Sequence, residues 1–171
     1  MAPDILFTAE QIQDRVRVMA RQIAAARLRP DICMPVLVGG FVFAADLLRA
    51  LSWEGVALDV EMIWLRSYGD KRVASAISMI AGPSEQIAGR HVLVVDGVLD
   101  AGRTVAKAVS LIRAAGAASV QVAVVLDKQR IDAVAKADFV GFHVGNDFVV
   151  GYGMDDAGRY RGLPYIGKVP G

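Results

Sequence analysis

The sequence predicts an α/β protein in which a mostly parallel β-sheet is flanked by helices. Apolar runs of strand length alternate along the chain with amphipathic segments of helix length. Hydrophobic residues make up 54% of the chain, and many of them are Ala and Val. This composition fits tightly packed helices on parallel strands that are buried on both faces. Its 171 residues are enough for one domain with a sizeable core, and this composition excludes a disordered chain.

The first third of the chain predicts helix, strand, tight turn and helix. Thr8 and Gln11 fit a capping box, and apolar residues follow at helical spacing, so a helix should begin after Thr8. The apolar run 34–38 predicts a strand that ends in a turn at Gly39-Gly40. A second helix is expected over about 41–51, where apolar residues again recur at helical spacing.

The rest of the chain continues the alternation. Further strands are expected at 56–65, 76–80, 91–96, 120–126 and 139–144. Arg66 to Ala74 is polar and rich in turn residues, which predicts a loop. A helix is expected over 104–115, ending near Gly116. After Val150 the pattern becomes irregular, as in a tail that packs over a domain.

Charge and cysteine content limit the partners and the compartment. Lys and Arg number 19 against 18 Asp and Glu, with no basic stripe, so we expect no nucleic acid partner. No apolar run reaches the length of a bilayer span and no signal peptide is recognisable, so we expect no membrane partner and a cytoplasmic protein. The single cysteine, Cys33, fits a reducing compartment, and with two His it argues against structural zinc.

The segment after the strand at 91–96 is the strongest candidate for a functional site. It brings Asp96 and Asp100 to the carboxyl end of a buried strand, where open α/β sheets bind ligands. Small residues up to Gly102 and the start of a helix at Thr104 can form an anion cradle from backbone N–H groups. The two acids could serve sugar hydroxyls, Mg²⁺ or a reacting proton beside a phosphate, or they could simply cap the loop and the helix.

Val92 to Thr104 resembles the 5-phosphoribosyl 1-pyrophosphate (PRPP) signature of type I phosphoribosyltransferases, in which a strand and acids precede Asp-x-Gly-x-Thr. The segments that resemble hypoxanthine(-guanine) phosphoribosyltransferases in order and spacing are 37–40, 65–69, 126–128, 138–142, 147–153 and 163–169. The resemblance implies the type I phosphoribosyltransferase fold as a single domain over 1–171. Its core would span about 34–145, and a small hood would come from about 1–30 and 146–171.

The resemblance also implies an activity. Such enzymes transfer ribosyl 5-phosphate from PRPP to N9 of hypoxanthine, with guanine as a second candidate base, in purine salvage. The products are the nucleoside 5′-monophosphate and pyrophosphate, and Mg²⁺ is the expected cofactor. The expected partners are PRPP and an oxopurine, together with further copies of the chain in a homodimer or homotetramer.

The resemblance assigns roles around the purine. Asp100 would be the acid/base partner at N7, because a carboxylate there can assist proton movement as N9 becomes nucleophilic. Lys128 would donate to the 6-oxo group, since a cation that only donates favours oxo over amino groups. Phe148 would stack on the purine face, and Val149 would use its backbone on the base edge.

It assigns the remaining site residues to phosphates, metal and a lid. The expected PRPP- and phosphate-binding residues are Val38, Gly39, Gly40, Asp96, Gly97, Ala101, Gly102, Arg103, Thr104 and Arg161. Asp96 and Asp155 would hold Mg²⁺. Arg66, Ser67 and Tyr68 would begin a lid loop, continued by Gly69 to Arg72, that excludes water. The resemblance also suggests a cis peptide bond at Leu37–Val38.

Two positions depart from the pattern that this family usually shows. Val38 stands where the family usually has a lysine, and Gly97 stands where the second of two paired acids is usual. The loss of one acid predicts weaker PRPP binding, so Gly97→Asp should tighten it. His91 and His143 lie at or in strands and are expected to be structural.

Three other functions remain open at this stage. One is a nucleotide- or RNA-binding regulator on the same fold, and another is a transferase that prefers a different base such as xanthine. The third is a phosphoacceptor receiver domain, which also places acids and a lysine at strand ends. The length of the chain and the predicted phosphate cradle over 100–104 argue against a receiver domain.

Overall fold

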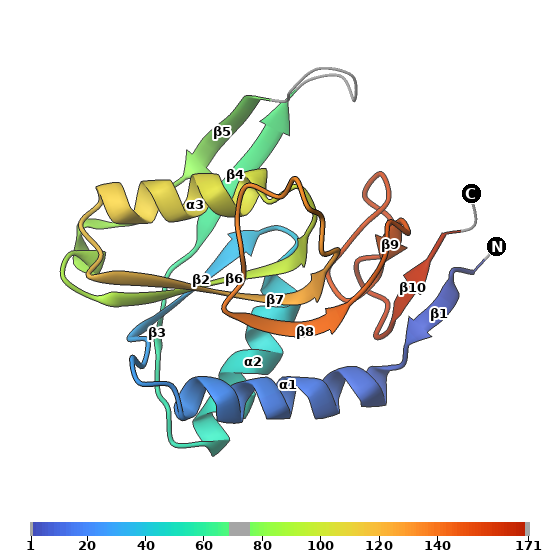
Figure 1. Cartoon of the computed structure of the whole chain (residues 1–171), viewed down its shortest axis with the longest axis horizontal. Coiled ribbons are helices and arrows are strands. Elements are labelled where there is room, and N and C mark those ends of the chain that lie inside the picture. The colour runs from blue at the N-terminus through green and yellow to red at the C-terminus, as the bar shows by residue number, and fades with distance from the viewer. Residues whose placement is uncertain (1, 69–75, 170–171) are drawn as a thin grey trace.

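The computed structural model describes residues 2–68 and 76–169, and within them a large sheet forms the centre of the molecule (Figure 1). Its strands are β2 (Ile32–Leu37), β3 (Asp59–Val60), β4 (Ile63–Tyr68), β5 (Ala76–Ala81), β6 (His91–Leu99), β7 (Ser119–Asp127) and β8 (Phe139–His143). The order is β5-β4-β2-β6-β7-β8, and β3 pairs with the start of β2. All these pairs are parallel except β4 with β5, as expected for a mostly parallel sheet.

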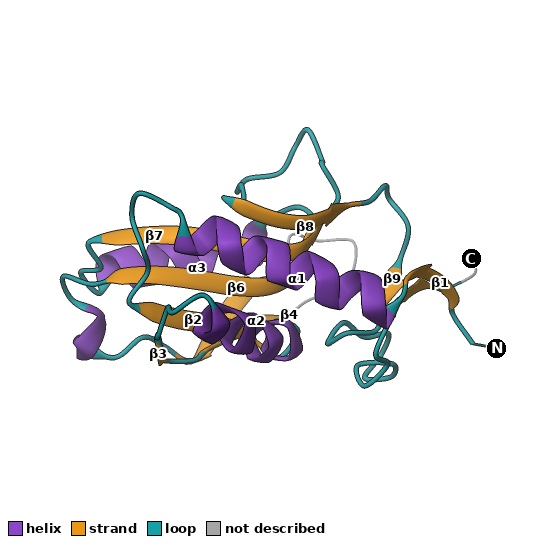
Figure 2. Cartoon of the chain, turned by 90° about the horizontal axis from the view of Figure 1, so that it is seen from below, coloured by secondary structure: helices purple, strands orange, loops and turns teal. Residues whose placement is uncertain are grey.

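Helices cover both faces of this sheet (Figure 2). The helices α1 (Ala9–Ala24) and α2 (Phe41–Trp53) lie on one face, α3 (Arg103–Ala114) lies on the other, and a short 3₁₀ helix, η1 (Glu85–Ile87), precedes β6. Alternate residues of β6 join different cores, because successive strand side chains point to opposite faces. Leu93 and Val95 pack with α1 and α2, whereas Val92 and Val94 pack with α3.

The start of α1 confirms the capping box. The Thr8 hydroxyl accepts a hydrogen bond from the Gln11 N–H at 3.2 Å, and the Thr8 N–H donates to Gln11 Oε1 at 2.9 Å. The two bonds satisfy N–H groups that a helix start otherwise leaves without partners. Ile12, Val16 and Met19 then face the core, as the apolar spacing predicts.

A second, small sheet joins the two ends of the chain. It consists of β1 (Asp4–Phe7), β10 (Ile166–Lys168) and β9 (Val149–Val150), all paired antiparallel, and the termini lie side by side at this end of the molecule (Figure 1). The sequence did not predict these strands, because two to four residues are too few for a recognisable alternation. The Tyr152 hydroxyl donates to Asp46 in α2 at 2.6 Å, which ties the segment after β9 to the central layers.

Two expectations about the middle of the chain were wrong. The strand expected over 56–65 is divided into the short β3 and β4, with a break before Ile63. Arg66 to Tyr68 are not loop, because pairing with β5 extends β4, with Arg66 opposite Ser78 and Ser67 opposite Ile77. The rest of the expected loop up to Ala74 lies outside the described residues.

The strand β6 is longer than its sequence suggests. It continues through Asp96 and Gly97 to Leu99, because β7 pairs with it along its whole length. The small-residue loop before α3 therefore consists of residues 100–102 only. Across residues 2–68 and 76–169, no helix has the length and apolar character needed to span a membrane.

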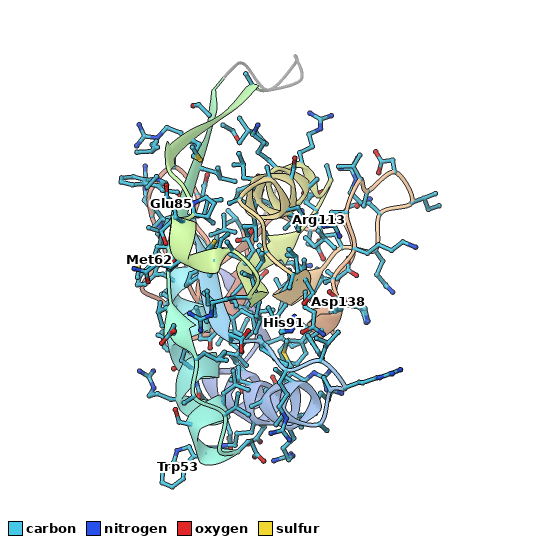
Figure 3. All side chains as sticks on the ribbon, turned by 90° about the vertical axis from the view of Figure 1, so that its left-hand side faces the viewer. Trp53, Met62, Glu85, His91, Arg113 and Asp138 are labelled. Carbon is cyan, nitrogen blue, oxygen red and sulfur yellow. The ribbon has the colours of Figure 1, made fainter. Side chains whose placement is uncertain are left out.

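The amino end of the sheet lies away from the catalytic candidates. Figure 3 looks onto this end and labels His91, which lies at the start of β6. His91 Nδ1 lies 2.7 Å from the Ser119 hydroxyl of the neighbouring strand. His91 thus joins two strand starts, which fits the structural role that we expected for it.

Candidate active site

A cleft of about 640 Å³ lies at the carboxyl ends of β2, β6 and β7, beneath the segment around β9. It gathers side chains from distant parts of the sequence. The expected site residues that line it are Gly39, Ser67, Asp96, Gly97, Asp100, Ala101, Gly102, Arg103, Thr104, Lys128, Phe148, Val149, Asp155 and Arg161. In open α/β sheets this edge is the usual place for a ligand.

The segment predicted to cradle an anion is the end of the loop after β6 and the start of α3. Gly102 is the N-cap residue and has a φ of 77°, in the left-handed region. A Cβ there would also lie 2.9 Å from the Ala135 nitrogen, so only glycine fits. Arg103 is exposed and Thr104 is half-buried, and the first N–H groups of α3 are available to an anion.

The turn after β2 contributes one of its two glycines to the cleft. The Leu37–Val38 peptide bond is cis, as expected. The Gly40 N–H donates to the Val36 carbonyl at 2.9 Å, and a Cβ on Gly40 would lie 2.4 Å from the Val95 carbonyl oxygen. Gly40 therefore serves close packing against β6, whereas Gly39 lines the cleft. Val38 is 38% exposed and is not among the described residues that line the cleft.

Asp100 lies between two cations. Lys128 Nζ donates to its Oδ2 at 2.9 Å, and Arg130 donates to its Oδ1 at 3.0 Å. Partial burial raises the pKa of Asp100, but the hydrogen bonds and charges of Lys128 and Arg130 outweigh it and hold the pKa below its usual range. Asp100 is therefore ionised at neutral pH.

Asp96 has the opposite electrostatic environment. Its Oδ1 accepts a hydrogen bond from the Gly97 N–H at 2.7 Å. Burial raises the pKa of Asp96 to about 7, and the hydrogen bond from Gly97 opposes this shift only in part. Two carboxyl groups four residues apart therefore differ in protonation near neutral pH, because among the described residues cations contact Asp100 but not Asp96.

The position of the missing second acid is crowded. A Cβ on Gly97 would lie 3.1 Å from the Gly39 carbonyl oxygen and 3.2 Å from Met154 Cγ. Met154 is buried and lines the cleft. Its apolar side chain thus takes up space that a side chain at position 97 would need.

The segment around β9 forms the opposite wall. Phe148 is 53% exposed and lines the cleft, so it is not a core residue. Its carbonyl accepts a hydrogen bond from the Val169 N–H at 3.2 Å, which holds it against the C-terminal strand. Val149 is buried in β9 and pairs with Lys168 of β10. An aromatic face therefore stands free at the cleft.

Asp155 and Arg161 form an ion pair at the edge of the cleft. Asp155 Oδ1 lies 2.8 Å from an Arg161 nitrogen, and Asp155 Oδ2 accepts from the Gly158 N–H at 2.6 Å. Arg161 also donates to the Gly153 carbonyl at 2.6 Å. Both side chains are partly exposed, so an anionic ligand could bind Arg161 and a metal ion could bind Asp155.

The proposed lid residues are only partly in the described region. Ser67 lines the cleft from β4, whereas the Arg66 guanidinium lies over the Trp64 ring, 5.8 Å from its centroid. Tyr68 is the last residue of β4. Gly69 to Arg72, the expected continuation of the lid, lie outside the described residues.

Seven lining residues were not predicted from the sequence, and Arg130 and Met154 matter most among them; the others are Val36, Leu37, Ile77, Val98 and Val105. Arg130 follows Lys128 by two residues in the loop after β7, so a second cation at the same strand end was a usable signal. Met154 carried no signal, because only the folded C-terminal segment brings it against Gly97.

Comparison with known proteins gives a consistent result. The chain matches the phosphoribosyl transferase domain family over residues 4–157. It is 35% identical to the hypoxanthine-guanine phosphoribosyltransferase of Bacillus subtilis, over 95% of this chain and 91% of that protein. It is 32% identical to the hypoxanthine phosphoribosyltransferase of Escherichia coli, over 97% of this chain and 94% of that protein. The chain belongs to the phosphoribosyl transferase domain family.

Longer relatives and solved structures agree. The bifunctional protein TilS/HprT of Listeria innocua is 37% identical over 95% of this chain, which spans only 25% of that protein. The hypoxanthine phosphoribosyltransferase of Trypanosoma cruzi, solved with the product IMP, has a TM-score of 0.88 and 35% identity, and the match covers 99% of this chain and 95% of that one. These matches confirm the type I phosphoribosyltransferase fold that the sequence predicts.

The raised pKa of Asp96 predicts a pH-dependent gain of stability for Asp96→Asn. Between pH 4 and about 7 the unfolded protein loses this proton while the folded protein keeps it, so the wild type loses stability as pH rises. The variant has no such group, and its advantage in unfolding free energy should grow by at most about 1.4 kcal/mol per pH unit. Denaturant titrations at pH 5 and pH 8 measure this, and an equal difference at both values contradicts it.

The crowding at Gly97 changes the outcome expected for Gly97→Asp. Alone, the new side chain must displace Met154 and press on the Gly39 carbonyl, so the gain in PRPP affinity should be small. In a Met154→Ala background it should bind PRPP and Mg²⁺ roughly tenfold tighter than Met154→Ala alone, as expected of a charge-assisted hydrogen bond. Calorimetry of both pairs measures this. Equal affinities in the Met154→Ala background would show that Gly97 is no deficit.

Proposed function

We propose that the chain transfers ribosyl 5-phosphate from PRPP to N9 of an oxopurine, with hypoxanthine as the first candidate and guanine as the second. The observation that carries the proposal is that Asp100, Lys128, Phe148 and Arg161 all line one cleft beside a phosphate cradle. The relatives of similar length from Bacillus subtilis and Escherichia coli support the proposal, because both are named as hypoxanthine phosphoribosyltransferases, the first with guanine as well.

The residues support the following course of reaction. The bond between N9 and C1 of the ribose forms while the bond between C1 and the pyrophosphate oxygen breaks, and its electron pair leaves with pyrophosphate. The proton on N7 of the base moves to the carboxylate of Asp100. Because Asp100 is ionised, it can accept this proton without first losing one.

The base is held by groups of three different elements. Phe148 offers an exposed ring for stacking, and the backbone of Val149 lies next to it. Lys128, at the end of β7, would leave Asp100 for the 6-oxo group. A lysine only donates hydrogen bonds, so it selects oxopurines over adenine. Xanthine also carries a 6-oxo group and remains a candidate base.

The phosphates are held around the glycines and at the ion pair. The 5-phosphate would lie on the cradle formed by Ala101, Gly102, Arg103 and Thr104. Pyrophosphate would lie near Gly39 and Arg161, and it would draw Arg161 away from Asp155. Ser67 and its neighbours in β4 would form part of a lid that keeps water away from the reacting atoms.

The carboxylates fit a Mg²⁺ ion that arrives with the substrate. Among the described residues, no three His, Cys, Asp or Glu side chains gather as a metal site. Mg²⁺ commonly uses one or two carboxylates and completes its shell with substrate phosphates and water, and Asp96 and Asp155 line the cleft at suitable places. When bound, the ion would neutralise charge on the departing pyrophosphate.

We further propose that the small sheet acts as a hood over the base. It includes β9 next to Phe148 and is closed by both chain ends, in one domain over residues 1–171. The helix α1 packs on α2 and β8, so the part of 1–30 that contributes to this hood is β1. The buried free thiol of Cys33 supports a reducing, cytoplasmic environment.

We also propose that the chain forms a homodimer or homotetramer. Exposed apolar side chains lie on one side of the large sheet, in β3, in the break before β4 and in the edge strand β5. They are Val60, Met62, Met79 and Ile80. Sedimentation velocity should give at least twice the mass of one chain, and a monomer at micromolar concentration contradicts the proposal.

A spectrophotometric assay with PRPP, Mg²⁺ and each of hypoxanthine, guanine, xanthine and adenine tests the function. We expect nucleotide from hypoxanthine and none from adenine. Asp100→Asn should lower kcat by about 10²–10⁴-fold, since the amide cannot take the N7 proton. The matched control is Asp14→Asn on the exposed face of α1, which should leave kcat unchanged. No product from any oxopurine would refute the proposal.

A further inference from the structure

Arg130 is the charged residue of the cleft that the sequence did not assign. It lies in the loop after β7 and faces two cavities, the cleft itself and a neighbouring cavity of about 570 Å³. Asp100 and Lys128 line both cavities as well. The three charged side chains therefore stand between the two cavities, and both cations donate hydrogen bonds to Asp100.

The guanidinium of Arg130 is fixed from two sides. Its Nε and one terminal nitrogen donate to the two oxygens of Asp132 at 2.8 and 2.7 Å. Its other terminal nitrogen donates to Asp100 Oδ1 at 3.0 Å. A bidentate pair fixes the plane of a guanidinium more firmly than a single bond does. Asp132 thus anchors Arg130 in the orientation that reaches Asp100.

The two partners of Asp100 differ in what they can do next. Lys128 carries a single ammonium group that can turn to another acceptor, and in the proposed reaction this acceptor is the 6-oxo group of the base. Arg130 has its other edge occupied by Asp132, so it stays where it is. After Lys128 turns away, Arg130 is the cation that remains at 3.0 Å from Asp100.

We propose that Arg130, anchored by Asp132, is a positioning residue that holds Oδ1 of Asp100, keeps the carboxylate charged and leaves Oδ2 facing the base. This inference rests on the proposed function, because it assigns Arg130 a part in that reaction. It also gives Asp132 a role as the residue that orients Arg130, at one remove from the carboxylate.

The charges that act on Asp100 from the described part of the chain come from the loop after β7. Lys128 and Arg130 are the charged groups that shift the pKa of Asp100, and Arg103 at the start of α3 acts on Asp132. Burial alone would raise the pKa of Asp100, so loss of Arg130 leaves less to oppose that effect. A merely structural arginine would not change the protonation of Asp100.

The test is the pH dependence of kcat in Arg130→Met, with saturating PRPP and hypoxanthine. The acid limb of the profile should move to higher pH by about one unit, while the KM for PRPP changes less than about twofold. Arg130→Lys should move the limb less, because it keeps the charge without the bidentate anchor. Asp132→Asn should move it in the same direction as Arg130→Met, by a smaller amount.

A matched control and an activity-independent readout complete the test. Arg17→Met removes an arginine from the exposed Arg17–Asp14 pair of α1, whose atoms lie 2.8 Å apart, and should leave the profile unchanged. The ¹³C carboxyl resonance of Asp100, identified by its loss in Asp100→Asn, should titrate at higher pH in Arg130→Met. This second measurement needs neither substrate nor turnover.

The outcomes separate this inference from the proposed function. If kcat in Arg130→Met falls equally at every pH, or if the resonance titrates as in the wild type, Arg130 does not position Asp100. If the wild type makes no nucleotide from any oxopurine, the proposed function fails and the catalytic part of the inference falls with it. The NMR titration would then still decide whether Arg130 holds the Asp100 carboxylate.

Discussion

The pairing of β6 between β2 and β7 fixes the centre of the large sheet and, with it, the positions of the helices and of the cleft. β6 is parallel to both neighbours and contributes alternate side chains to the cores on its two faces. Because it is buried on both faces, its register is strongly specified, and a slip by one residue would exchange the two cores. The position of its carboxyl end is thereby fixed, and Asp96, Gly97 and Asp100 are fixed with it.

Close backbone contacts then bring other segments to this end. Gly40 packs against the Val95 carbonyl, and a Cβ on Gly153 would lie 2.6 Å from the Gly39 carbonyl oxygen. Glycines at these points allow the turn after β2, the end of β6 and the segment after β9 to meet almost without intervening side chains. The hydrogen bond between Tyr152 and Asp46 adds a polar tie from that segment to α2. These three backbones form part of the cleft wall, and the end of β7, the start of α3 and residues of β4 and β5 complete it.

Electrostatics divide this cleft into two regions. On one side, Asp100 is held as a carboxylate by Lys128 and Arg130. On the other side, no cation from residues 2–68 or 76–169 contacts Asp96, and burial raises its pKa to about 7. The first is a carboxylate whose charge is already balanced by two cations, so that one of them can turn to another acceptor. The second is a carboxyl group whose ionised form gains most from an arriving cation. One strand end thus offers two acids with different chemistry.

The sequence was enough to predict the alternation of strands and helices, the capping box at Thr8, and the small-residue turn that leads into α3. These features depend on residues close together in the chain, so local patterns carry them. It also identified the family and most residues of the cleft, through the motifs around Asp100, Lys128 and Phe148. Four features became visible only in the folded chain: the chain ends form a sheet, β4 extends through Tyr68, Met154 crowds Gly97, and Arg130 pairs with Asp100. Each of these depends on pairing or packing between segments far apart in the chain, or on which way a side chain turns in a loop, and no local spacing encodes them.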